Sequence, residues 1–248
     1  MTATDILRRN NISVTGNAQG RTPVLAHGFG CDQAMWRLTV PALTLSEDRY
    51  ASLAGYAQDA VDVRSTRPAR CGVRGTAVSA MIGVLAADMA PERIAALAMM
   101  GPSPRHIDDG YRGGFSAEDI EELLASLEVN YLGRSAAMAP VVMGNPEQPE
   151  LGEELKNSFC ATDPDMARIF ARTTFLSDSR RDLKSVRVPT LVLECTQDVI
   201  APREVGAFVH QEIPGSTLVT LEATGHCPHR SAPEATNEAL TGFLADLR

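Results

Sequence analysis

Apolar residues along the chain occur both in short continuous runs and in longer stretches with helical spacing. Strands are predicted at residues 11–14, 22–28, 93–101, 188–194 and 216–222, and the continuous apolar run at 93–101 is typical of a buried strand. The helical spacing predicts helices at residues 32–43, 53–63 and 78–89, and a last helix carrying Ala235, Leu240, Phe243 and Leu247. Strands and helices therefore alternate, which predicts an α/β fold with a mostly parallel sheet and helices on both faces.

The middle of the chain has a different pattern, helical and acidic from Ser116 onward. Ser116 and Asp119 have the spacing of a capping box, and Asp163 followed by Pro164 predicts the start of another helix. No strand is predicted between residues 105 and 181. We therefore expect a core made of residues 1–104 and 186–248, interrupted by a helical cap at residues 105–185.

Composition narrows the classes of partner. The 248 residues include 23 basic and 31 acidic side chains, for a net charge of −8, which argues against nucleic acid and anionic membranes as partners. The polar start predicts no secretory signal, and the longest apolar run, around residues 78–87, is too short to span a bilayer. The five cysteines are scattered without a CxxC pair, which predicts reduced thiols in a cytoplasm. The absence of a metal-ligand cluster, phosphate loop or dinucleotide fingerprint predicts no metal and no cofactor.

Three loops carry candidate chemistry at the carboxyl ends of predicted strands, where open α/β sheets place their sites. In "HGFGCDQ", residues 27–33, two glycines allow backbone N–H groups to turn toward a ligand, although a plain glycine turn is an alternative. Asp198 and His226 follow later strands. Each alone also fits a structural role, Asp198 as a solvated turn residue. Together they fit an aspartate that orients a histidine serving an upstream nucleophile.

The order nucleophile, aspartate, histidine predicts a G-x-S-x-G elbow before Asp198. The best candidate is the segment of residues 75–79, "GTAVS", whose central position is Ala77. Ser79 lies two residues further on, in the first turn of the predicted helix, so its hydroxyl is not expected to reach the site. The chain therefore has a methyl group where this pattern requires a nucleophile.

Several long strings resemble the RsbQ-type α/β-hydrolases: "HGFGCDQAMW", "LAGYAQDAVDV", "VSAMIGVLA", "MGPSPR", "NSFCATDPDMARIFARTTFLSDSR" and "ATGHCPH". That group includes a bacterial stress-response activator that acts with a partner phosphatase, and the plant karrikin and strigolactone receptors. The resemblance implies an α/β-hydrolase core and a four-helix cap over an apolar pocket that His27 and Phe29 line. It implies an oxyanion hole from the backbone of Phe29 and Val78. It assigns Asp198 and His226 to a triad whose serine falls on Ala77.

The chain departs from this family in two places. A strand and loop expected between residues 43 and 50 are missing, and the family places this strand near the middle of the sheet. Its loss leaves buried backbone groups of the neighbouring strands unpaired, at about 1–3 kcal/mol each. The segment of residues 64–77 replaces the apolar strand before the elbow and holds four arginines, Arg64, Arg67, Arg70 and Arg74. An anion-binding loop and a solvated charged turn are two interpretations. We prefer a third, a slipped reading frame: shifted by one base, suitable codons for residues 66–76 encode "LDLRDVVFVG", and one restored base then encodes the elbow serine.

Three functions stay open at this stage. The chain is a serine hydrolase of small apolar esters or lactones, with activity doubtful because of Ala77. Alternatively, it is a non-catalytic signalling protein that binds such a ligand and activates a partner phosphatase. The third possibility is a non-functional product of the frame shift. Turnover, a ligand-dependent rise in melting temperature, and cooperative unfolding distinguish the three.

Overall fold

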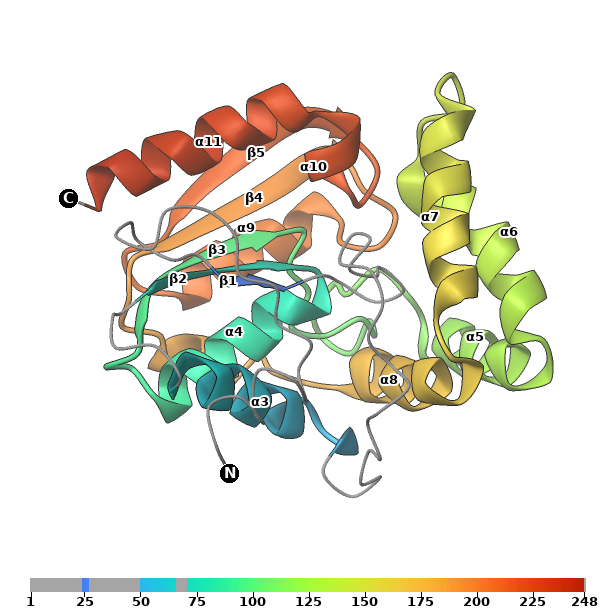
Figure 1. The fold of residues 1–248 in the computed structure, drawn as a ribbon, viewed down its shortest axis with the longest axis horizontal. Coiled ribbons are helices and arrows are strands. Elements are labelled where there is room, and N and C mark those ends of the chain that lie inside the picture. Colours follow the sequence, from blue (N-terminus) through green and yellow to red (C-terminus); the bar gives the residue numbers. More distant parts are fainter. Residues whose placement is uncertain (1–23, 27–49, 66–70, 248) are drawn as a thin grey trace.

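The computed structural model describes residues 24–26, 50–65 and 71–247, and its centre is a parallel β-sheet (Figure 1). Within these residues the sheet has five strands in the order β1-β2-β3-β4-β5, and each neighbouring pair is parallel. Their carboxyl ends therefore lie along one edge. The strands are β1 (Val24–Ala26), β2 (Cys71–Thr76), β3 (Ile94–Met100), β4 (Thr190–Gln197) and β5 (Thr217–Thr224).

Helices cover both faces of the sheet because side chains alternate along each strand. Leu97 and Met99 of β3 contribute to one apolar cluster, which includes α4 and residues of α3 and α9. Ala98 and Met100 contribute to a second cluster, against which Leu240 and Phe243 of α11 pack. Figure 1 shows α11 and α4 on opposite sides of the sheet. These helices are α3 (Leu53–Ser65), α4 (Val78–Met89), α9 (Arg203–Glu212) and α11 (Pro233–Asp246), with the short α10 (Pro228–Ser231) before α11.

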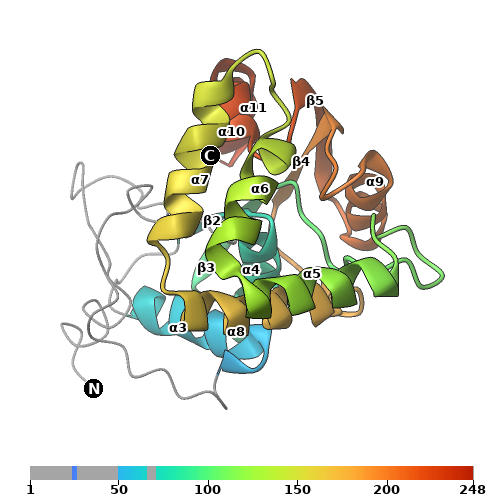
Figure 2. The ribbon, with the colours of Figure 1, turned by 90° about the vertical axis from the view of Figure 1, so that its right-hand side faces the viewer.

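Four helices lie between β3 and β4 and gather beside the sheet (Figures 1 and 2). Ser116 begins the first of them with the predicted capping box, and Asp163 accepts hydrogen bonds from the backbone at the start of the last. The first, second and fourth of these helices share an apolar cluster containing Ile120, Leu124 and Phe175. The helices are α5 (Ala117–Val129), α6 (Tyr131–Met143), α7 (Pro149–Ala161) and α8 (Pro164–Leu176), and the short helix η1 (Asp182–Ser185) precedes β4.

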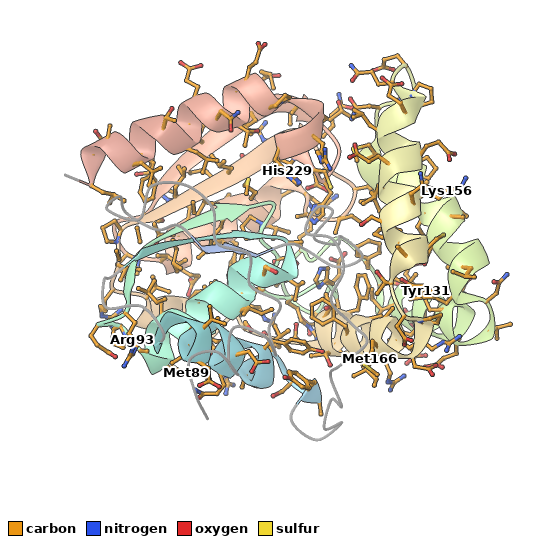
Figure 3. The ribbon with its side chains drawn as sticks, in the orientation of Figure 1. Met89, Arg93, Tyr131, Lys156, Met166 and His229 are labelled. Atoms are coloured by element: carbon orange, nitrogen blue, oxygen red, sulfur yellow. The ribbon has the colours of Figure 1, made fainter. Side chains whose placement is uncertain are left out.

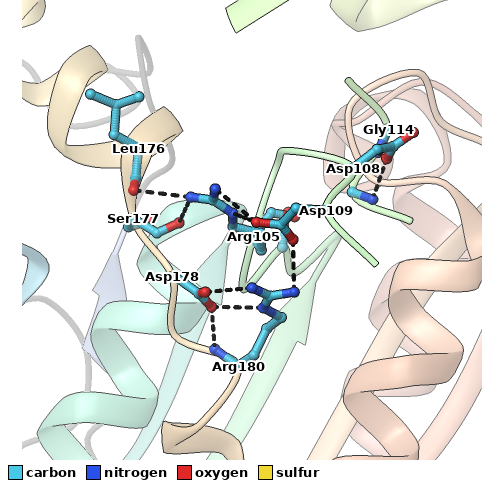
Figure 4. Close-up of polar contacts among 10 residues, drawn as sticks. Arg105, Asp108, Asp109, Gly114, Leu176, Ser177, Asp178 and Arg180 are labelled. Atoms are coloured by element: carbon cyan, nitrogen blue, oxygen red, sulfur yellow. Dashed lines mark hydrogen bonds and ion pairs between the residues drawn. The ribbon is translucent and has the colours of Figure 1, made fainter. Parts of the chain in front are cut away.

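A charged network joins the segment that leaves β3 to the segment that returns from α8 (Figure 4). Arg105 pairs with Asp109 and donates to the carbonyl oxygens of Leu176 and Ser177. Arg180 binds both carboxylate oxygens of Asp178, at 2.8 and 2.6 Å, and one oxygen of Asp109 at 2.8 Å. The two connections between the sheet and the four helices are therefore fastened to each other.

One expectation for the region before Ala77 changes in the structure. Residues 71–76 form strand β2, so this part is neither a loop nor a charged turn. The reason is tertiary, because β1 and β3 supply ladder partners on both sides of β2. The ladder runs unbroken from β1 to β5. The expected loss of a strand between residues 43 and 50 stays a prediction, because residues 27–49 lie outside the described part of the chain. The predicted elements at residues 11–14 and 32–43 lie outside the described residues, and the core and cap boundaries stay a prediction.

Candidate functional site

Ala77 sits at a sharp turn between β2 and α4. Its φ is 50° and its ψ is −123°, and it is the one residue other than glycine with a positive φ within the described ranges. Its backbone N–H donates to the carbonyl oxygen of Met100 on the neighbouring strand, at 2.9 Å. A sharp, strained turn from strand to helix is the geometry of a nucleophile elbow. The structure therefore builds the elbow around a side chain that has no nucleophilic atom.

Asp198 and His226 come together from the ends of two neighbouring strands. Asp198 follows β4, His226 follows β5, and Nδ1 of His226 lies 2.7 Å from Oδ2 of Asp198. The aspartate side chain is 1% exposed and the histidine side chain 9%. Oδ1 of Asp198 accepts the backbone N–H groups of Ile200 and Ala201, at 2.8 and 3.1 Å. These bonds fix the carboxylate, which in turn fixes the plane of the imidazole.

The electrostatics of this pair favour an ionised aspartate. Burial by itself raises the pKa of Asp198, but attraction to His226, the hydrogen bond from His226 and the two backbone N–H groups outweigh burial. The net effect is a pKa below its ordinary value. Nε2 of His226 is buried and has no hydrogen-bond partner within the described part of the chain. The imidazole thus has one nitrogen bound to the carboxylate and the other available to a reacting group.

The elbow and the histidine both adjoin the end of β3. Ala77 is hydrogen-bonded to Met100, and the next residue, Gly101, has a φ of 55°. A Cβ atom at Gly101 would lie 2.9 Å from Cε1 of His226 and 3.4 Å from Oδ2 of Asp198. Glycine is required there because the pair packs directly on the backbone. The fold therefore brings Ala77, Asp198 and His226 to one edge of the sheet.

The structure describes some of the remaining predicted site residues and not others. Val78 is the first residue of α4, and a helix leaves its first four N–H groups without intrahelical partners, so this N–H can be offered to an oxyanion. Ser79 is buried in the first turn of α4. His27 and Phe29, predicted for the pocket and for the second oxyanion-hole N–H, lie outside the described residues. Their roles, like those of the triad members, stay predictions.

Two further histidines lie near the site and were missed from the sequence. His106 is 3% exposed, and its Nδ1 has no partner among the described residues. Burial, together with the neighbouring His226 and Arg105, lowers the pKa of His106 to about 3. His229 on α10 faces the four helices (Figure 3), and burial, with Arg230 and His226 nearby, lowers its pKa to about 4. No local motif marks either residue, because His106 is buried and His229 is half-buried by contacts distant in sequence.

The described residues contain neither a candidate metal site nor a candidate membrane span. No three side chains of histidine, cysteine, aspartate or glutamate gather there in a way that could hold a metal ion. In the same residues, no helix has the length and apolar character needed to cross a membrane.

Comparison with known proteins identifies the class. The sequence pattern of the alpha/beta hydrolase family matches residues 24–239, so the chain belongs to this family. Strigolactone esterase D14 of Arabidopsis thaliana is 34% identical over 94% of this chain and 95% of that protein. Karrikin insensitive 2 receptor IA of Petunia hybrida is 33% identical over 94% of this chain and 93% of that receptor. The relatives therefore include proteins named as esterases and as receptors.

Solved structures agree with the fold. A hydrolase from Oleispira antarctica superimposes with a TM-score of 0.92 at 35% identity, over 99% of this chain and 98% of that one. The enol-lactonase of Burkholderia xenovorans has a TM-score of 0.74 at 20% identity, over 93% and 94% of the two chains, which shows a shared fold alone. The predicted α/β-hydrolase fold, with its parallel sheet and flanking helices, is confirmed.

Proposed function

We propose that this chain is an RsbQ-type member of the family that binds a small apolar ester or lactone at the Ala77 elbow, and whose hydrolytic chemistry lacks only the nucleophile. The observation that carries this is the buried His226–Asp198 pair, whose Nε2 has no partner within the described residues, beside an elbow built at Ala77. A pair fixed this way is suited to take a proton from a hydroxyl at position 77.

The chemistry with serine at position 77 follows from these positions. His226 Nε2 accepts the hydroxyl proton as the oxygen attacks the ester carbonyl, and Asp198 stabilises the imidazolium that forms. The N–H of Val78, with that of Phe29, stabilises the negative oxygen of the tetrahedral intermediate. With Ala77, no covalent intermediate forms, so we expect the natural chain to bind ligand with little or no turnover.

The variant A77S tests this proposal. We expect A77S to hydrolyse 4-nitrophenyl acetate and to be labelled by a fluorophosphonate, because the His226–Asp198 pair is already in place to accept the proton of the new hydroxyl. The natural chain is the matched control, since it already contains Ser79 two residues further on. If A77S folds and is neither labelled nor active, the proposed hydrolase site is wrong.

A signalling function is the second candidate, because the relatives include proteins named as receptors. Binding needs no serine, and the partner proposed from the resemblance is a phosphatase of stress signalling. We expect a series of γ-lactones with alkyl chains of increasing length to raise the melting temperature of the natural chain. A series without any effect would argue against ligand binding.

The origin of Ala77 is proposed to be a slipped reading frame combined with an internal deletion. The alignment with the Arabidopsis relative spans 256 positions, more than the 248 residues of this chain, so it contains gaps on this chain's side. Resequencing the gene across codons 40–80 tests both events.

The scattered cysteines support the proposed cytoplasmic location.

A further inference from the structure

The end of helix α6 is in direct contact with the loop that carries His226. The backbone N–H of His226 donates to the carbonyl oxygen of Val142 at 2.9 Å. Val142 lies in the last turn of α6, where carbonyl groups have no intrahelical partner. The histidine backbone thus caps a helix that is more than eighty residues away in sequence and lies outside the sheet (Figure 2).

Asn145 makes two further hydrogen bonds at the same contact. Its Nδ2 donates to the carbonyl oxygen of Met143 at 2.6 Å and to that of Thr224, the last residue of β5, at 2.9 Å. One amide group therefore joins the end of α6 to the strand that leads into His226. Gly144, with a φ of 65°, ends α6 in the left-handed conformation that aims Asn145 at β5.

The backbones at this contact touch without intervening side chains. Gly225, just before His226, has a φ of 92°, and a Cβ atom there would collide with the carbonyl oxygen of Met143. A Cβ atom at Gly144 would lie 3.2 Å from Cα of Gly225. The Gly225 N–H donates to the carbonyl oxygen of Gln197, the residue before Asp198. The contact is therefore continuous from α6 to both members of the His226–Asp198 pair.

We propose that Asn145 is a positioning residue that holds His226 in line with Asp198 and with position 77. The effect of Asn145 on turnover rests on the proposed function. Its effect on the position of His226 rests on the contacts of Asn145 and Val142 alone. It follows that a displacement of α6 moves the His226 backbone with it.

The variant N145D tests the proposal in the natural chain. Aspartate has the same shape but replaces the donating amide with an oxygen that repels the carbonyl oxygens of Met143 and Thr224. The readout is the far-downfield proton resonance of the His226 Nδ1–H···Asp198 hydrogen bond, which needs neither a nucleophile nor a substrate. We expect this resonance to lose at least half of its intensity in N145D and in N145A, while both variants stay folded by circular dichroism.

The matched control is N130A, at the opposite end of the same helix. Asn130 caps the start of α6 by accepting the Gly133 N–H, so its loss weakens α6 without touching His226. We expect N130A to keep the resonance. A resonance retained in N145D, or lost equally in N130A, would overturn the proposal.

Kinetics in the A77S background separate this inference from the proposed function. We expect N145D to lower kcat of A77S by about 10- to 100-fold, since small misplacements of catalytic groups have effects of this order, and to leave KM within about twofold. If A77S itself is inactive, the hydrolase proposal fails, and the resonance in the natural chain still decides the role of Asn145.

Discussion

The backbone N–H of Ala77 donates to the carbonyl oxygen of Met100 at 2.9 Å, which holds Ala77 at a φ of 50° and a ψ of −123°. Residues with a side chain avoid such conformations at a cost of about 1–3 kcal/mol. The elbow therefore keeps its strained backbone although its side chain is a methyl group. That strain leads to the first prediction.

The variant A77G should be more stable than the natural chain. Glycine relieves the strain at positive φ, and this gain exceeds the greater entropy that glycine adds to the unfolded state, about 0.4–1 kcal/mol. We expect a net gain of about 1 kcal/mol in the free energy of unfolding, measured by urea denaturation. The control A80G, inside α4, should be destabilised. If A77G lost as much stability as A80G, the elbow would not be strained.

In the proposed triad, removing the charge of Asp198 should prevent His226 from acting as a base. In the A77S background, D198N should lower kcat by about 10⁴-fold, the loss expected when a triad carboxylate is removed, because Asn stabilises no imidazolium. Steady-state hydrolysis of 4-nitrophenyl acetate measures this. The control D165N changes an exposed aspartate on α8 that pairs with Arg168, and its kcat should equal that of A77S. Equal rates in both variants would rule out a role for Asp198.

The stability of the natural chain should fall with pH below about 6.5, partly because of His106. Its pKa is about 3 in the folded state against 6.5 ordinarily, so between these values the unfolded chain takes up a proton that the folded chain does not. Lower pH therefore favours unfolding. The variant H106F keeps a ring against Phe175, whose centroid lies 5.1 Å away, and should lose about 1 kcal/mol less between pH 7 and pH 5.5. Parallel stability curves for the two proteins would contradict a buried neutral His106.

The network of Arg180 should stabilise the joined segments in a salt-dependent way. Arg180 binds Asp178 and Asp109 and lies over the ring of Tyr111, 5.4 Å from its centroid. The pairs are partly exposed, so R180A should cost about 1 kcal/mol at low salt and less at 1 M NaCl. The control K156A removes an exposed pair with Glu153 on α7 and should leave the melting temperature unchanged. If the thermal unfolding curve of R180A at low salt matched that of K156A, the network would contribute nothing to stability.

Local sequence patterns determined those helices, strands and caps that depend only on residue type and spacing within a short segment. The continuous apolar run of β3, the bounds of α4 and the capping box of α5 follow from residue type and spacing, and the structure confirms them. The loops carrying Asp198 and His226 were also predictable, because each follows an apolar strand and parallel strands place their carboxyl ends on one edge.

Tertiary structure decided what depends on contacts between distant segments. Residues 71–76 are unfavourable for a buried strand, and they form β2 because β1 and β3 offer hydrogen bonds on both sides. The burial of His106, the contact of His226 with Val142 and the bridge of Asn145 to Thr224 each join parts of the chain that share no pattern. Residue spacing carries the period of a helix or strand, whereas the position of a catalytic group to within an ångström is set by packing among elements that only the fold brings together.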